Sequence, residues 1–251
     1  MLIHGNSACK EIFDYQMAAP FTDRYRMIAV DLPGHGGSDP EAEPNFDPHK
    51  SYTMKGYAGV MVEVLSALNR TEAAVLGWSL GGHVALEMAP IFPGLKGLMI
   101  TGTPPLSHDP AEAATAFLPS PHMALTGKEE LTDREVEDYA AANCGSRPMP
   151  FMVDAVKRTD GRARSVMIAD AQAGGASDQK AIAAGLTIPF AIVNGADEPF
   201  VSNAYIQGMG LTNLWRGQPH FIENGGHAPF WQEPPAFNAL FEPFLAEVLP
   251  G

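Results

Sequence analysis

Length, composition and charge restrict the class of protein before any motif is considered. The chain has 251 residues, of which 45% are hydrophobic and 18% are charged, a balance typical of one large globular domain. Its formal net charge is −13 and it has no cluster of Lys and Arg, so neither a nucleic acid nor an anionic membrane is an expected partner. No apolar run approaches the roughly 20 residues of a membrane span, so we expect a soluble, cytoplasmic protein.

Short apolar runs alternate with amphipathic stretches, the pattern of a mostly parallel sheet flanked by helices. The expected strands cover residues 2–3, 27–30, 73–76, 98–101 and 188–193, and the helices expected around them cover residues 54–68, 80–92 and 235–248. The strand at residues 27–30 is expected to be buried. Because the chain begins inside an apolar run that ends at once in a turn, we expect that the first strands of the sheet are missing at the N-terminus.

The strand pattern is interrupted in the middle of the chain. This part is rich in Ala and in charges, and Thr132 followed by Glu135 is a capping box that predicts a helix through Asn143. Further helices are predicted over residues 151–158 and 162–171. We therefore divide the chain into an α/β core of residues 1–103 and 185–251 and a helical cap of residues 104–184.

A serine lies between a predicted strand and a predicted helix, in the sequence Gly77-Trp78-Ser79-Leu80-Gly81. This is a G-x-S-x-G nucleophile elbow in the strand–turn–helix context that the motif requires. The turn is so tight that side chains beside the serine would collide with the strand or the helix. Ser79 is then exposed at a helix N-terminus, whose dipole favours developing negative charge, and we predict it as the nucleophile rather than a residue of an ordinary Gly-rich turn.

A base and an acid complete the prediction. A serine hydroxyl needs an adjacent base with a pKa near neutrality, and His227 lies in a turn-rich loop after the last strand, which matches the chain order Ser, acid, His. The alternative for His227 is a packing histidine. The loop after the strand at residues 188–193 carries two adjacent carboxylates, Asp197 and Glu198, and only one of them can orient His227. The residues themselves leave that choice open.

Two backbone amides are candidates for the oxyanion hole. His4-Gly5-Asn6 follows the first strand, so we expect the Asn6 and Leu80 N–H groups to face the developing oxyanion, each worth about 3–4 kcal/mol. A plain turn is the alternative reading of His4-Gly5. The Gly-rich loop of residues 31–38 is expected to be architectural, with its histidine outside the chemistry.

In this order, these segments resemble the α/β-hydrolase superfamily from the first residue to the last. Several segments further resemble AidH-type N-acyl-homoserine lactonases, which open the lactone ring of bacterial quorum-sensing signals without a metal: Gly77–His83, Gly97–Pro105, Arg158–Arg164 and the stretch from Val193 to Val201. The resemblance implies Glu198 rather than Asp197 as the triad acid, and it places Tyr139 over the active site as a contact to a substrate oxygen. It also implies two strands before Met1.

The resulting hypothesis is a quorum-quenching serine lactonase that works through Ser79, His227 and Glu198, with a seryl-ester intermediate. The expected partner is a small acyl lactone or ester, and the protein is expected to be a monomer or a weak homo-oligomer. Its two cysteines and eight scattered histidines predict no metal and no cofactor. Substrate contacts are expected from Tyr139, Trp78, Phe117, Met123, Phe151 and Met152. The alternatives are a carboxylesterase, a carbon–carbon bond hydrolase of the same fold, or a receptor that turns over little.

Overall fold

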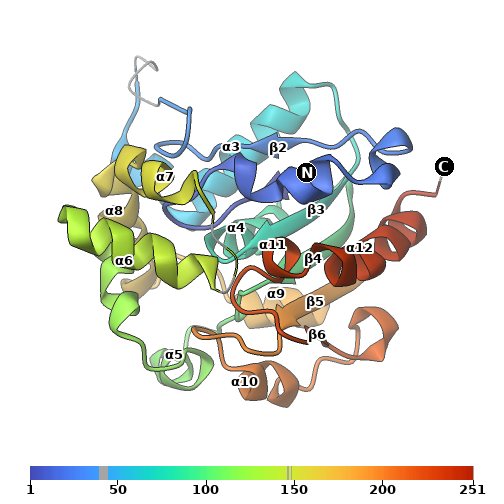
Figure 1. Ribbon diagram of the computed structural model, residues 1–251. Helices are drawn as coiled ribbons and strands as arrows, with labels where there is room; N and C mark the ends of the chain where they lie inside the picture. Colours follow the sequence, from blue (N-terminus) through green and yellow to red (C-terminus); the bar gives the residue numbers. More distant parts are fainter. Residues whose placement is uncertain (40–44, 146, 148, 251) are drawn as a thin grey trace.

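A parallel sheet of six strands forms the centre of the computed structural model, which describes residues 1–39, 45–145, 147 and 149–250 (Figure 1). The strand order is β2-β1-β3-β4-β5-β6, and each pair of neighbours is parallel. The strands are β1 (Leu2–Ile3), β2 (Ala29–Val30), β3 (Ala73–Trp78), β4 (Leu95–Thr101), β5 (Phe190–Gly195) and β6 (His220–Ile222). The predicted α/β-hydrolase fold, with its mostly parallel sheet, is confirmed.

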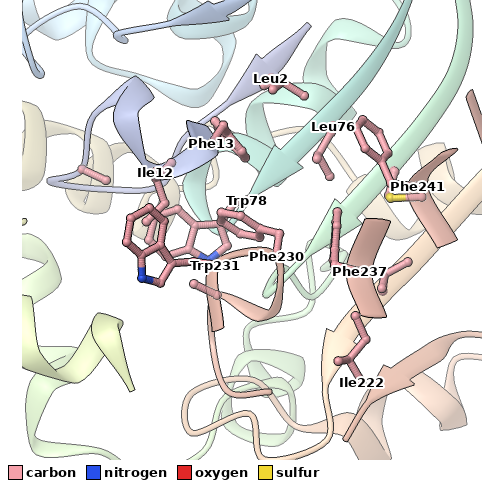
Figure 2. Close-up of a cluster of buried hydrophobic side chains, with 14 of the residues drawn as sticks. Leu2, Ile12, Phe13, Leu76, Trp78, Ile222, Phe230, Trp231, Phe237 and Phe241 are labelled. Carbon is pink, nitrogen blue, oxygen red and sulfur yellow. The ribbon is translucent and has the colours of Figure 1, made fainter. Parts of the chain in front are cut away.

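Helices cover both faces of the sheet, as burial of a parallel sheet requires. Side chains of β3 alternate between two apolar clusters: Val75 packs with α3 (Met54–Ala67) and α4 (Leu80–Met88), whereas Leu76 packs with α12 (Pro234–Val248). Figure 2 shows the second cluster, in which Leu76 and several aromatic side chains of the C-terminal region lie together. The shorter helices of this part are η1 (Lys10–Phe13), α1 (Asp14–Met17), η2 (Pro20–Asp23), α2 (Pro48–Ser51), α10 (Asn203–Gly208), η5 (Trp215–Gly217) and α11 (Pro229–Gln232).

A run of helices connects β4 to β5, in the part of the chain expected to be the cap. These helices are α5 (Pro110–Ala116), η4 (Pro121–Gly127), α6 (Asp133–Cys144), α7 (Met152–Arg158), α8 (Gly161–Gln172) and α9 (Gln179–Gly185). Figure 1 shows α6, α7 and α8 gathered on the side of the molecule away from α12. The predicted capping box is confirmed, since Thr132 Oγ1 accepts from the Glu135 N–H and Glu135 accepts from the Thr132 N–H. The division of the chain into two domains stays a prediction.

Two predictions about core elements are wrong in part. The predicted buried strand at residues 27–30 is reduced to β2, which is only half-buried because it lies at an edge of the sheet and pairs with β1 alone. The helix predicted over residues 80–92 ends at Met88. Its end has a local cause, because Pro90 has no N–H to continue the helical hydrogen bonds, although Ala89 keeps helical backbone angles.

β1 is also short, and it pairs with β2 on one side and with β3 on the other. The backbone nitrogen of Met1 lies 2.8 Å from the Ala74 carbonyl oxygen of β3. The expectation that strands are missing before Met1 stays a prediction.

Candidate active site

The turn between β3 and α4 holds Ser79 in a backbone conformation that a non-glycine residue rarely adopts. Its φ is 54° and its ψ is −120°. The neighbouring glycines have the steric role that the sequence predicts: a Cβ on Gly77 would overlap the Gly81 carbonyl oxygen, and one on Gly81 would overlap the Ile3 carbonyl oxygen. Strain of this kind costs about 1–3 kcal/mol and persists where the surrounding structure enforces it. The local sequence therefore builds the nucleophile elbow.

Contacts with β4 and with the segment after β1 fix the position of this turn. The Ser79 N–H donates to the Thr101 carbonyl oxygen at 2.9 Å, and Thr103 Oγ1 donates to the Ser79 carbonyl oxygen at 2.8 Å. A Cβ on Gly5 would lie 3.0 Å from the Ser79 Cβ, which leaves little room for any residue but glycine. The turn after β1 thus passes directly beside the predicted nucleophile.

Glu198 and His227, in the loops after β5 and β6, form a buried carboxylate–imidazole pair. His227 Nδ1 is 2.9 Å from Glu198 Oε1 and 3.0 Å from Glu198 Oε2, and the side chains of the two residues are 5% and 0% exposed. Glu198 Oε1 also accepts from the N–H groups of Phe200 and Val201, at 3.0 and 3.3 Å. A carboxylate held in this way favours the tautomer with a proton on Nδ1 and leaves Nε2 free to act as a base.

The ring of His227 is enclosed by two aromatic side chains. Phe200 meets it edge-on with ring centroids 4.9 Å apart, and Trp78 lies 5.4 Å away and donates through Nε1 to the His227 carbonyl oxygen at 2.8 Å. A Cβ on Gly102 would come within 2.8 Å of His227 Cε1. Ser79 Oγ makes no hydrogen bond in the described part of the chain. Such catalytic hydrogen bonds often form only when substrate is bound.

The two adjacent carboxylates of the β5 loop have different surroundings. Asp197 is exposed, and its N–H donates to the Gly225 carbonyl oxygen at 2.9 Å. Glu198 contacts His227. Geometry therefore agrees with the assignment that the family resemblance implies, and Asp197 is left in the role of a solvated loop residue.

The two oxyanion-hole candidates occupy the expected elements. Leu80 is the first residue of α4, where N–H groups lack acceptors within the helix. Asn6 is buried in the turn after β1. Within the described ranges, neither backbone N–H donates to a protein acceptor. Their role stays a prediction.

The predicted substrate-contact residues are distributed over the cap and the core. Tyr139 is buried on α6, and burial raises its pKa above the usual value for a phenol. Trp78 and Met152 are fully buried. Phe117, Met123 and Phe151 are half-buried, and Phe151 packs edge-on against Trp231. Contact of these residues with a substrate stays a prediction.

Arg164 is a residue that the sequence analysis did not single out. It lies on α8 and is 4% exposed, yet its guanidinium reaches Ser7 Oγ in the turn after β1, at 3.2 Å. The sequence offers no signal for this contact, because 157 residues separate the two side chains. It joins the cap to the turn beside Ser79.

The Gly-rich loop after β2 is held by side chains outside the candidate site. The Asp31 carboxylate accepts from the Lys10 and Gly37 N–H groups, at 2.8 and 3.0 Å, and His4 Nε2 accepts from the Leu32 N–H at 3.0 Å. His35 is buried within this loop, and burial lowers its pKa to about 3. These contacts suit the architectural role expected for the loop.

The described residues contain no group of three or more His, Cys, Asp or Glu side chains arranged to hold a metal ion. In the same ranges, no helix combines the length and the apolar character needed to cross a bilayer.

Comparisons with known proteins place the chain among α/β hydrolases. Residues 1–240 match the profile of a family described as "Alpha/beta hydrolase family". A solved structure of a mutant of the N-acyl homoserine lactonase AidH, complexed with N-hexanoyl homoserine lactone, has a TM-score of 0.93 and 42% identity. The match covers 99% of this chain and 89% of that one. An AidH complex with N-butanoyl homoserine matches equally well, over 100% of this chain.

Curated sequences match less closely. The pimeloyl-[acyl-carrier protein] methyl ester esterase of Klebsiella pneumoniae is 27% identical over 271 residues, covering 98% of this chain and 91% of the esterase. An uncharacterized protein of Mycobacterium tuberculosis is 35% identical over 100 residues, which are 40% of this chain. The match spans only 27% of the length of that mycobacterial protein.

Proposed function

Because this chain belongs to the alpha/beta hydrolase family, we propose that it hydrolyses carboxylic esters with Ser79 as nucleophile, His227 as general base and Glu198 as the acid that orients His227. The observation that carries the proposal is the buried Glu198–His227 pair together with a serine in a strained strand-to-helix turn, and the residue before that serine, Trp78, donates to the His227 carbonyl oxygen. Perturbed backbone geometry and a shielded carboxylate–imidazole pair are the two features that this chemistry needs.

The proposed substrate is the lactone ring of an N-acyl homoserine lactone, so that the biological role would be quorum quenching. Support comes from the AidH structures, which resemble this chain at 42% identity over nearly its whole length and contain N-hexanoyl homoserine lactone or N-butanoyl homoserine. A neutral lactone also requires no charged binding patch. Metal ligands are not needed for this route, because the serine and histidine supply the nucleophile and the base.

Ring opening would proceed by acyl transfer. His227 Nε2 takes the proton of Ser79 Oγ as the oxygen attacks the ring carbonyl, and the N–H groups of Asn6 and Leu80 would stabilise the tetrahedral oxyanion. When the ring C–O bond breaks, the leaving alkoxide takes the proton back from His227, which leaves a seryl ester. A water deprotonated by His227 then attacks this ester and releases the acyl homoserine and free Ser79.

The tethered leaving group makes the second step demanding. The new hydroxyl stays attached to the acyl group and can attack the seryl ester, which would close the ring again. Productive turnover therefore requires water to reach the ester before the hydroxyl does. We expect helices of the cap to position that water above Ser79.

A simple ester is the second candidate substrate. It is favoured by the likeness to the Klebsiella methyl ester esterase, which extends over 98% of this chain. Lactone and ester hydrolysis use the same three side chains, so the site geometry does not separate them. Substrate preference must be measured.

The direct test follows proton release from a long-chain N-acyl homoserine lactone with a chelator present, for the wild type and for Ser79→Ala. Acid release by the wild type alone would support a metal-independent serine lactonase. Cleavage of a simple aryl ester without lactone opening would contradict the lactonase proposal and keep the ester hydrolase. Lack of activity on both substrates would contradict the proposed function itself.

A further inference from the structure

Side chains of the turn that carries Asn6 are bonded to the helical segment between β4 and β5. Asn6 Nδ2 donates to the carbonyl oxygen of Thr126 in η4, 2.8 Å away. Next to it, Ser7 Oγ donates to Asn6 Oδ1 at 3.2 Å and accepts from Arg164 Nη1 at 3.2 Å. Two helical segments, more than 100 residues away in sequence, thus contact two consecutive residues beside Ser79.

Arg164 is placed at considerable energetic cost. It is 4% exposed, and within the described residues no carboxylate lies at ion-pair distance from it. Its charge is compensated by the carbonyl oxygens of Lys128 and Glu129, both at 2.8 Å, and by Ser7 Oγ. Burying a charge is unfavourable unless its hydrogen bonds are satisfied, and these three acceptors satisfy the guanidinium, so an apolar side chain here would leave them without this donor.

The turn itself is strained. Ser7 has a φ of 57°, in the left-handed region that non-glycine residues rarely occupy. Strain of about 1–3 kcal/mol persists only where the surrounding contacts enforce it. One such contact is the backbone bond from the Ala8 N–H to the Gly5 carbonyl oxygen at 3.3 Å, and the others are the Arg164 bond to the Ser7 side chain and the Thr126 bond to the Asn6 side chain. Loss of the two side-chain bonds leaves the turn with fewer restraints, so the Asn6 N–H can shift.

We propose that Arg164 is a positioning residue for the oxyanion hole: together with Thr126 it holds the Asn6–Ser7 turn in the conformation that presents the Asn6 N–H to the oxyanion. The hole is then complete only while η4 and α8 lie against the core. This inference rests on the proposed serine hydrolase function, but it does not depend on whether the substrate is a lactone or a simple ester. Arg164 acts through Ser7, since it has almost no surface of its own for substrate.

Kinetic constants distinguish the proposed positioning role of Arg164 from a purely structural role. A structural tether would lower stability and leave the chemistry of the folded enzyme unchanged. A misplaced oxyanion donor weakens binding of the transition state and leaves ground-state binding nearly intact, so kcat falls while KM does not.

The test compares Ser7→Ala and Arg164→Met with two matched controls on the same helix, Ser165→Ala and Arg162→Met. Ser165 donates to Glu129 and Arg162 pairs with Asp160, contacts that lie within the helical segment between β4 and β5. Activity is measured on an aryl ester. Affinity is measured for two ligands. One is an aryl trifluoromethyl ketone, whose carbonyl carbon is attacked by Ser79 Oγ to give a tetrahedral oxyanion, and the other is the carboxylic acid product.

We expect Arg164→Met to lower kcat by about 10- to 100-fold, less than the 10²–10³ for loss of a whole oxyanion donor. Ser7→Ala should lower kcat by about 3- to 10-fold, a part of the same effect. Affinity for the ketone should fall in parallel, whereas KM, product affinity and both controls stay within about twofold. Arg164→Lys keeps the positive charge but lacks the planar guanidinium with its several N–H donors, so it should restore little of the lost kcat.

Several outcomes would overturn the proposal. If Ser7→Ala is folded by circular dichroism and has wild-type kcat and ketone affinity, the turn needs no such support, even where Arg164→Met fails to fold. A rise of KM without a fall of kcat would instead make Arg164 a substrate-binding residue. Absence of Ser79-dependent ester cleavage in the wild type would overturn the proposed function, and this inference with it.

Discussion

At the scale of single residues, Glu198 and Asp197 show how neighbours in one loop acquire different roles. Their side chains carry the same charge, but one is enclosed beside His227 and the other is exposed to solvent. A buried carboxylate that accepts two backbone N–H bonds and faces an imidazole stabilises the imidazolium of the transition state. An exposed one is screened by water.

The adjacent carboxylates provide a matched pair of variants. Glu198→Gln should lower kcat by about 10³–10⁴, because an amide in this position favours the wrong tautomer of His227. Asp197→Asn should stay within about twofold of wild type, in line with the small effects of exposed charges. Initial rates on an aryl ester at pH 7 give both values. Equal losses in the two variants would contradict the assignment of the acid.

A second prediction at this scale concerns pH and the buried histidines of the architectural loop. Burial lowers the pKa of His4 to about 4 and that of His35 to about 3, from 6.5 for an exposed histidine. Between these values the unfolded chain binds protons that the folded chain does not, so the free energy of unfolding falls as the pH is lowered from about 6.5 towards 4. Each histidine can contribute on the order of 3 kcal/mol to this loss.

The variant His35→Asn keeps a donor near the Pro33 carbonyl oxygen, which His35 Nδ1 contacts at 3.1 Å, and removes the titrating group. Urea unfolding at pH 7 and pH 5 should show a smaller loss of stability in this variant than in wild type. His108→Asn, at an exposed position, should keep the wild-type loss. An unchanged pH dependence in His35→Asn would contradict the prediction.

At the scale of elements, the elbow between β3 and α4 depends on close backbone approach. The contact of Gly81 is with the carbonyl oxygen of Ile3 in the neighbouring strand β1, and a backbone atom cannot move aside as a flexible side chain can. This packing brings the N-terminus of α4 against the sheet and places Ser79 at the end of β3. The close contact between α4 and β1 is therefore possible only because Gly81 has no Cβ atom.

Adding a Cβ atom at position 81 should disrupt the elbow between β3 and α4. Gly81→Ala should lower the free energy of unfolding by more than about 3 kcal/mol, because overpacking against backbone exceeds the usual 1–3 kcal/mol cost of an extra methyl group. Gly59→Ala, in α3, meets nothing within 4 Å and should stabilise the protein by up to about 1 kcal/mol. Thermal and urea unfolding measure both. A wild-type melting temperature for Gly81→Ala would refute the steric argument.

At the scale of the whole molecule, the helical segment between β4 and β5 contacts the rest of the chain at several separate places. One is the Asn6–Ser7 turn beside Ser79. Another is at α4, where the buried Glu87 carboxylate accepts from the Ser177 N–H at 2.8 Å and from Gln179 Nε2 at 3.0 Å. The second junction bonds the end of the helical segment to α4, and the first brings η4 and α8 into contact with the turn beside Ser79.

Removal of the buried carboxylate should loosen the second junction. Glu87→Ala leaves the Ser177 N–H and Gln179 Nε2 without this acceptor, so the free energy of unfolding should fall by about 1–3 kcal/mol. Glu137→Ala, at an exposed position of α6, should change it by less than about 0.5 kcal/mol. Equilibrium urea unfolding of the two variants checks the difference; equal effects would count against a role for this junction.

Local steric and chemical rules explain why much of the core was predictable. The elbow around Ser79 needs glycine at close backbone contacts, and apolar runs such as Ala73–Leu76 predict buried strands. Both features can therefore be predicted from short segments of sequence. The capping box at Thr132 is local in the same way. The extent of β2 was not predictable by this route, because its burial depends on which strands lie beside it.

The sequence by itself determined the α/β order of elements, the strained turn at Ser79 and the presence of a histidine and two carboxylates in loops after strands, because these follow from periodicity and from contacts between near neighbours. The family resemblance implied Glu198 as the acid, but the contact of Glu198 and not Asp197 with His227, and the reach of Arg164 to Ser7, are visible only in the tertiary structure. Such choices depend on the relative placement of loops and helices that are 29 and 157 residues apart, which no local propensity specifies.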